Sequence, residues 1–457
     1  MFRRYVILAR VLALLAGFAL SAAACSDDTD AVTSPDSTVP PTTTTISTTP
    51  TAPDRGNFAS FRGVTEDTIK IGVTVPDFDA LQAAGLPNYQ GDTRIAYQAF
   101  IDDINESGGI HGRMIEAVYA DFSFVDPASQ DAACAQLTDD EEVFIVLFGL
   151  LADANLCFTE LHETMVISFS YQTIAARARS GDTVWLQEEA ADEAEAEILV
   201  SVVSEAGYLD GATVGILASE ATGGLVVGET VEQTLADIGH GSEVYLAADT
   251  GGDGAARDRE IQRLAQRMQA DGVDFLFNLG GGGTWTEDLA EAGFHPPRTA
   301  YLVLNTDTEA ASDKTLLAGA LAVGSVSPDD VWADAEFQET CITPILDAHP
   351  ELTEEFSYLP DADQQAAGER NWLTQARSAC NQTRLLTRLG EIAGADLTND
   401  TFRAALDELG PVELLGYGQA SFTSEGKWDG LDEFSLQEYD VETDSLVAIG
   451  DAIVVDR

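Results

Sequence analysis

Basic residues are scarce in this sequence. Its 457 residues include 23 lysines and arginines against 78 aspartates and glutamates, and only three of the basic residues are lysines. Nucleic-acid phosphates and anionic lipid surfaces both attract a basic face, so this composition argues against binding to either. The acids are spread along the chain rather than gathered in one tail, which predicts a solvated acidic surface.

Signatures of catalysis, metals and nucleotides are lacking too. The five histidines are scattered, and no cysteine pair has the CxxC spacing of a zinc site. Residues 162–166 begin like the HExxH motif of zinc proteases but have no second histidine. The four glycines at 280–283 lack the lysine and the serine or threonine of a P-loop. We therefore expect a protein that is not an enzyme and that needs no cofactor and no metal.

The chain begins with features of an export signal. Two early arginines precede an apolar run from Val6 to Ala24. Small residues before Cys25 resemble the bacterial lipobox, in which the cysteine thiol takes a lipid, although Ala22 stands where that motif prefers leucine. An ordinary signal peptide, cut after an Ala-x-Ala pattern, is the alternative. We expect residues 1–24 to be a lipoprotein signal peptide and Cys25 to be the lipid anchor.

A segment rich in threonine, proline and aspartate follows at 25–62. It has no apolar periodicity and cannot bury enough surface to offset the entropy lost on ordering. We expect a disordered stalk that separates a folded domain from the membrane. The protein is then extracytoplasmic, held at the outer face of the cell membrane by the lipid on Cys25.

Four further cysteines predict two disulfides, because an even number of cysteines in an exported chain is typical of a disulfide framework. Pairing between neighbours in sequence gives Cys134–Cys157 and Cys341–Cys380. This pairing is one of three connectivities that four cysteines allow.

Apolar strand-like runs alternate with helical patterns along the rest of the chain. A β-branched run at 69–76 precedes an amphipathic helix at 92–107, and a short helix is expected at 155–162. Such alternation indicates an α/β fold with parallel sheets and helical crossovers. About 400 residues exceed what a single core supports, so two lobes are expected.

One stretch resembles a known family. The helix pattern at 97–113 ends in Ile-Asn-x-x-Gly-Gly-Ile-x-Gly-Arg, and the runs 272–277 and 422–430 agree with the same family. The chain resembles the leucine/isoleucine/valine-type periplasmic binding proteins, the solute receptors of branched-chain amino acid ABC importers. The resemblance covers about 65–455, and the Cys134–Cys157 pair is similar to a first-lobe disulfide of some members.

The resemblance implies two Rossmann-like lobes with parallel sheets, joined by a three-crossover hinge. The crossovers are expected near residues 186, 324 and 415. The first lobe then comprises 65–185 and 325–415, and the second lobe 187–323 and 418–457.

Ligands of open α/β sheets bind beyond the carboxyl ends of the strands. By resemblance, the ligand-binding residues are Asp153, Ser170, Tyr171 and Gln172 in the first lobe, and Thr222, Trp285 and Asp307 in the second. Asp307 stands where relatives place an acid for the ligand's ammonium group. Both aspartates can instead be solvated loop acids, and Trp285 can be packing between helix and sheet.

The resemblance implies a monomeric solute-binding lipoprotein that captures a small polar ligand by lobe closure and presents it to ABC permease subunits. Asp153 repels a carboxylate and Thr222 replaces a common stacking tyrosine, so we expect an amino acid or a related amide or amine rather than a plain branched-chain amino acid. A sensory ligand-binding component that signals occupancy to a membrane partner is the alternative.

Overall fold

The computed structural model describes residues 56–83, 90–169, 178–181, 183–250, 253–280, 283–302, 313–358, 360, 362–455 and 457. Cys25 lies outside these residues. Among the described helices, none combines the length and the apolar character that crossing a bilayer requires. Residues 56–62, which the sequence assigned to the stalk, pack against the first lobe, where the Phe61 ring lies 6.2 Å from that of Phe144. The disorder expected at this end of the stalk is therefore wrong.

The first sheet is parallel and has the strand order β2-β1-β3-β4-β5. Its strands are β1 Thr68–Pro76, β2 Met114–Phe122, β3 Ile145–Phe148, β4 Met165–Ser168 and β5 Trp185–Gln187. Every residue of β3 and β4 is buried. Burial on both faces is what a continuous apolar run predicts for a parallel sheet.

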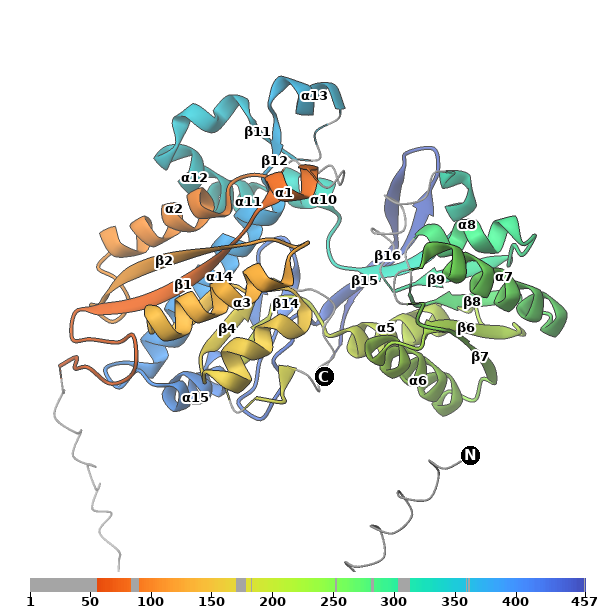
Figure 1. Cartoon of the computed structure of the whole chain (residues 1–457), viewed down its shortest axis with the longest axis horizontal. Helices are drawn as coiled ribbons and strands as arrows, with labels where there is room; N and C mark the ends of the chain where they lie inside the picture. The colour runs from red at the N-terminus through yellow and green to blue at the C-terminus, as the bar shows by residue number, and fades with distance from the viewer. Residues whose placement is uncertain are drawn as a thin grey trace, which may run out of the picture. The chain divides into compact units, whose positions relative to one another are not determined.

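Helices cover both faces of this sheet (Figure 1). Helix α3, Pro127–Ala135, lies on one face, and helices α2, Thr93–Glu106, and α14, Leu373–Ala393, lie together on the other. The Asp92 carboxylate accepts a hydrogen bond from the Arg94 amide and begins α2, as the sequence predicts. A Cβ atom at Gly390 of α14 would lie 2.6 Å from Ile110, so this glycine permits close packing there.

The helix expected at 155–162 is replaced by a 3₁₀ turn, η2 at Ala152–Asn155, and a π-helical turn, η3 at Cys157–Leu161. The Asn155 side chain accepts from the Leu150 amide and donates to the Leu150 carbonyl, which ties this segment to the loop after β3. A disulfide joins Cys157 to Cys134 of α3. The second expected disulfide, Cys341–Cys380, is also present.

The second sheet has the order β16-β15-β10-β9-β8-β6-β7, and its last two strands along the chain are antiparallel. The strands are β6 Val214–Ser219, β7 Ser242–Ala247, β8 Phe275–Asn278, β9 Arg298–Tyr301, β10 Leu321–Gly324, β15 Glu433–Asp440 and β16 Ser445–Val454. Helices α5 Asp192–Glu205 and α6 Thr222–Asp237 lie on one side of it, and α7 Gly254–Asp271 and α8 Gly283–Glu291 on the other (Figure 1).

The stretch between β10 and β15 is mainly helical. It contains α10 Pro328–Ala333, α11 Ala335–Phe337, η5 Gln338–Ile342, α12 Thr343–Ala348, η6 Pro350–Glu354, α13 Ala362–Ala367, α14 and α15 Asn399–Leu409, with two short strands, β11 Phe356–Ser357 and β12 Arg370–Asn371. This stretch, which includes α14, belongs to the first lobe.

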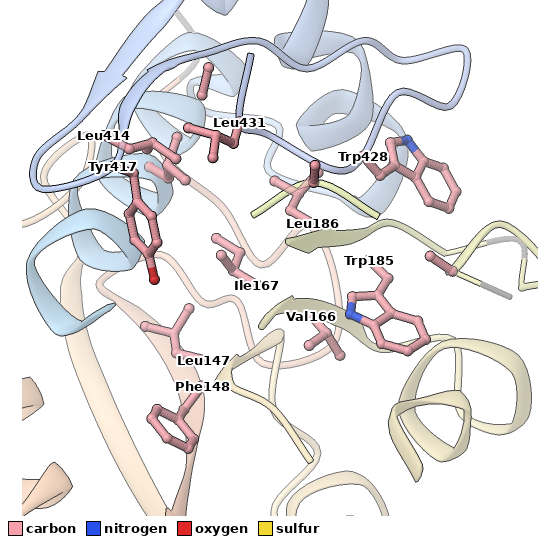
Figure 2. Packing of buried hydrophobic residues seen from close by; sticks show 14 of the residues in the cluster. Leu147, Phe148, Val166, Ile167, Trp185, Leu186, Leu414, Tyr417, Trp428 and Leu431 are labelled. Atoms are coloured by element: carbon pink, nitrogen blue, oxygen red, sulfur yellow. The ribbon is translucent and has the colours of Figure 1, made fainter. Parts of the chain in front are cut away.

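The third connection to the second sheet comes later than residue 415. Strands β13 Val412–Leu414 and β14 Gly418–Ala420 form a hairpin that packs on the first lobe. Figure 2 shows Tyr417 and Leu431 near Leu147 and Leu186 of the first sheet. The Gln187 amide also donates to the Trp428 carbonyl. Apolar burial thus keeps the chain on the first lobe until β15.

Candidate functional site

A pocket of about 310 Å³ lies at the carboxyl ends of the first sheet. The residues around it come from α1 Phe78–Ala83, from the ends of β2, β3 and β4, and from the start of α14. Its lining consists of Phe78, Leu81, Gln90, Phe124, Phe148, Phe169, Thr374 and Gln375. None of these described lining residues carries a charge, so this part of the site favours apolar groups and hydrogen bonding.

The phenylalanines of the pocket form two pairs. The rings of Phe148 and Phe169 are stacked, with centroids 5.7 Å apart and planes inclined by 11°. The rings of Phe78 and Phe124 are 5.9 Å apart and tilted by 37°. Phe148 is buried, whereas the other three rings are partly exposed. They therefore present apolar surface that a bound molecule can cover.

The Phe148 backbone is held in an unusual conformation. Its φ angle is 69°, and that of Gly149 is 79°. Left-handed backbone at a bulky residue costs free energy and is kept where surrounding contacts enforce it. Here the Phe148 amide donates to Gln382 Oε1 at 2.7 Å, and the Gly149 carbonyl accepts from Thr74 Oγ1 at 2.5 Å. These contacts fix the direction of the Phe148 ring.

A buried polar network connects this backbone with the first interlobe connection. Gln382 Oε1 also accepts from the Tyr97 hydroxyl at 2.7 Å, and its Nε2 donates to Glu188 Oε2 at 2.9 Å. Glu188 follows β5 and is fully buried. Loss of hydration raises the pKa of the Glu188 carboxyl to about 8. The acid is therefore mainly protonated at neutral pH.

Two side-chain amide carbonyls of the pocket accept no hydrogen bond within the described part of the chain. They belong to Gln90 and to Gln375, whose residue is only 1% exposed. An unsatisfied buried acceptor costs roughly 1–3 kcal/mol. A bound molecule that carries a donor recovers this cost, so these oxygens are well suited to hold a ligand hydroxyl, amine or amide group.

A second cavity, of about 490 Å³, is lined in part by basic side chains. Two of them already form ion pairs with aspartates. Lys427 Nζ lies 3.0 Å from Asp432, and Arg457 Nη1 lies 2.7 Å from Asp429. Asp429 also accepts from the Ala191 amide. This cluster joins the connections between the sheets and offers no strong site for an anion.

A third cluster, Cys134, Cys157 and His162, is compact enough for a metal, but its two sulfur atoms are joined in the disulfide. A thiolate is the metal-binding form of cysteine, so these sulfurs are not ligands in this state.

Most residues predicted for the site lie elsewhere or outside the described chain. Ser170, Tyr171, Gln172 and Asp307 lie outside the described residues. Asp153 is exposed on η2 and does not line the pocket of about 310 Å³.

In the second lobe, Thr222 begins α6 after the end of β6. Trp285 is 5% exposed and packs in a buried cluster with Leu217 and Leu276.

Sequence reasoning did not single out the four phenylalanines. In the structure, each of the four lies at the last residue of a strand or within two residues beyond it: Phe78 after β1, Phe124 after β2, Phe148 in β3 and Phe169 after β4. Gln375 has no such position, since it comes from a helix more than 200 residues away along the chain.

Comparisons with known proteins agree with this architecture. The family model described as periplasmic binding protein matches residues 68–428. A search of curated proteins finds no match. A substrate-binding protein of an ABC transporter from Desulfitobacterium hafniense, in complex with leucine, has a TM-score of 0.58 at 16% identity, covering 84% of this chain and 100% of that chain.

Two further solved structures share the fold. A solute-binding protein of an ABC transporter from Rhodopseudomonas palustris, in complex with 3,4-dihydroxybenzoic acid, has a TM-score of 0.58 at 14% identity, covering 86% of this chain and 98% of its own. A fatty acid ABC transporter substrate-binding protein from Thermomonospora curvata has a TM-score of 0.57 at 15% identity, covering 86% and 94%. With its two-lobed α/β fold and a family match over most of its length, the chain belongs to the periplasmic binding protein family.

Proposed function

We propose that this protein is the extracytoplasmic solute receptor of an ABC importer, which captures a small polar ligand by lobe closure and delivers it to permease subunits. The pocket at the carboxyl ends of the first sheet is the observation that carries this proposal, because ligands of open α/β sheets bind at that edge. The ABC transporter proteins among the similar solved structures support the same role.

An amino acid or a related amide or amine remains the ligand class we propose. Ser170, Tyr171, Gln172, Thr222 and Asp307 are the proposed polar contacts, with Asp153 and Trp285 as further candidates. Among them, Asp307 is the partner for a ligand ammonium group, so Asp307→Asn is expected to weaken an amine-bearing ligand more than tenfold.

Cys25 is the proposed lipid anchor. A tether holds the receptor near its permease and raises the effective concentration there. Mass spectrometry of the protein from membranes is expected to find a diacylglycerol on Cys25, and Cys25→Ser is expected to release the protein from the membrane. An unmodified Cys25, or a chain that begins elsewhere, contradicts the anchor without affecting solute binding.

A thermal-shift screen tests the solute-binding role. The purified protein is heated with amino acids, amides, amines, aromatic acids and fatty acids, one at a time. A ligand present at 100 times its dissociation constant stabilises the folded state by about 2.7 kcal/mol. A reproducible rise in melting temperature with one class supports the proposal, and no rise with any class contradicts it.

A further inference from the structure

The four phenylalanines form an apolar wall of two ring pairs because of the strand order. Strands β2, β1, β3 and β4 are neighbours in the sheet, so residues that follow their carboxyl ends meet at one edge. Phe124 follows β2, Phe78 follows β1, Phe148 ends β3 and Phe169 follows β4. The wall therefore depends on the fold rather than on a local sequence motif.

The geometry of this wall suits a flat ring. Aromatic rings prefer offset-stacked or edge-to-face contacts with centroids about 4.5–7 Å apart. The Phe148–Phe169 and Phe78–Phe124 pairs, at 5.7 and 5.9 Å, leave partly exposed ring surface beside the pocket. A saturated chain covers the same surface but gains none of the ring–ring electrostatic attraction.

The size of the pocket agrees with one ring and its substituents. A dry apolar cavity of about 150 Å³ holds benzene. The pocket here has about 310 Å³. The additional volume accommodates polar substituents on a single ring.

Gln90 and Gln375 specify the polar part of the ligand. Their carbonyl oxygens are buried beside the rings and accept no hydrogen bond from the residues that the structure describes. Gln375 lies on α14 one turn before Ser378, which lies close to Glu188 of the buried network. A ligand group that donates hydrogen bonds satisfies these oxygens, whereas a bare carboxylate oxygen is repelled by them.

From these features we infer that the solute carries a single aromatic ring with at least one hydrogen-bond donor, such as a hydroxyl, amino or carboxamide group. The ring lies against the partly exposed rings of Phe78, Phe124 and Phe169, and the donor bonds Gln90 or Gln375. This inference rests on the proposed solute-binding function. It adds an aromatic ring to the ligand, and it also admits a ligand whose only donor is a hydroxyl group, which is neither an amino acid nor an amide or amine.

Matched pairs of probes test the inference by isothermal titration of the purified protein. The aromatic probes are 4-hydroxybenzamide, tyramine and 4-hydroxybenzoate, and each is compared with its saturated-ring counterpart and with the compound that lacks the hydroxyl group. At least one aromatic probe is expected to bind ten times more tightly than its saturated counterpart. Loss of the hydroxyl group is expected to weaken that probe at least fivefold.

Two variants identify the residues responsible. Phe169→Leu keeps an apolar side chain but removes the ring, and is expected to abolish the preference for aromatic over saturated probes. Gln375→Leu removes the acceptor and is expected to abolish the preference for the hydroxyl group. Phe402→Leu is the matched control, because Phe402 is buried against Phe144 in the same lobe and does not line the pocket.

The possible outcomes separate the two proposals. The aromatic inference is overturned if leucine or another aliphatic solute binds and the aromatic probes bind no more tightly than it does, or do not bind. That result leaves the solute-binding role intact. Binding of an aromatic probe that Phe169→Leu and Phe402→Leu change equally also overturns the aromatic inference. The absence of binding by every probe and by every solute of the thermal-shift screen contradicts the solute-binding role itself.

Discussion

The carboxyl ends of the two sheets differ in kind. At the first sheet, rings point to a pocket and the strand ends are held by buried side-chain hydrogen bonds. At the second sheet, the large rings face the core, where Trp285 is buried and the Tyr301 hydroxyl lies 3.0 Å from Thr286 Oγ1. Asn278 ends β8 with a buried amide nitrogen that has no acceptor.

The described strand ends of the two lobes therefore carry different kinds of side chain. Phenylalanine rings stand at the described strand ends of the first sheet, whereas Ser219 ends β6 and Asn278 ends β8 in the second sheet. The first edge must also be rigid, because a ring is recognised by orientation. The following predictions test that rigidity, from the largest expected effect to the smallest.

Gly149→Ala is expected to destabilise the protein most. A Cβ atom there would lie 2.8 Å from Asn155 Oδ1 and 2.9 Å from Ser168 Cβ, at a φ angle of 79°. Left-handed backbone and overpacking together cost roughly 2–5 kcal/mol. Chemical denaturation measures the loss. Gly223→Ala in the second lobe is the control, since a Cβ atom there meets nothing within 4 Å, and an equal loss in both variants contradicts the contrast.

Removal of the Cys134–Cys157 disulfide is expected to cost about 3 kcal/mol, because the closed loop of the unfolded chain is released. The double variant with alanine at both positions is compared with wild type by urea denaturation. A matched double variant at Cys341 and Cys380 shows whether the effect belongs to the strand-end loops. If ligand affinity falls only when Cys134–Cys157 is removed, the disulfide supports the pocket edge; equal affinity in both variants contradicts that role.

Glu188→Gln is expected to change how stability depends on pH. The folded-state pKa of about 8 exceeds the usual value for glutamate, so the folded protein retains a proton that the unfolded chain releases. Wild type therefore loses stability as pH rises from about 5 to 8, on the order of 3 kcal/mol from this group. Other titratable or charged groups lie near the Glu188 carboxyl and remain in the variant. They are Tyr97, Tyr417, Arg377 and Glu189.

Melting temperatures at pH 5 and pH 8 measure this effect. The variant is expected to lose less stability than wild type between the two values. Glu116→Gln, at an exposed position of β2, is the control and should follow wild type. A variant with the same pH dependence as wild type shows that Glu188 does not carry a proton in the folded state.

Tyr301→Phe is expected to have the smallest effect. It removes the contact between the Tyr301 hydroxyl and Thr286 Oγ1 and leaves the ring in the core, at a cost of about 1 kcal/mol. Denaturation measures the change, and affinity for an aromatic probe should stay within twofold. A larger loss of affinity shows that the second edge also orients the ring.

The sequence predicts the regular parts of the fold well. Strand β1, helix α2 and the alternation that forms two lobes follow from apolar periodicity, and the Asp92 cap and the glycines after α2 mark its ends. Apolar periodicity describes local structure. These elements are stabilised largely by burial of the apolar face that their own sequence pattern defines.

The site depends on information that local patterns do not hold. The helix expected at 155–162 is a run of 3₁₀ and π-helical turns, which apolar periodicity does not distinguish from an α-helix. The phenylalanine wall requires the strand order β2-β1-β3-β4, and the Gln375 amide comes from a distant helix. The rule for open α/β sheets selected the carboxyl edge, and the resemblance then selected loop residues, most of which lie outside the described chain.

The most direct test of ring recognition is a measurement of contacts between a bound aromatic probe and the protein. Nuclear Overhauser spectra of the protein with isotope-labelled phenylalanine, recorded with the tightest aromatic probe of the titration series, report which rings lie within about 5 Å of the ligand ring, on the scale of ring–ring packing distances. Contacts from the ligand ring to Phe78, Phe124 and Phe169 are expected, and Phe169→Leu is expected to weaken the contacts to Phe78 and Phe124 as well. A bound aromatic probe that contacts none of these three rings contradicts ring recognition at this pocket.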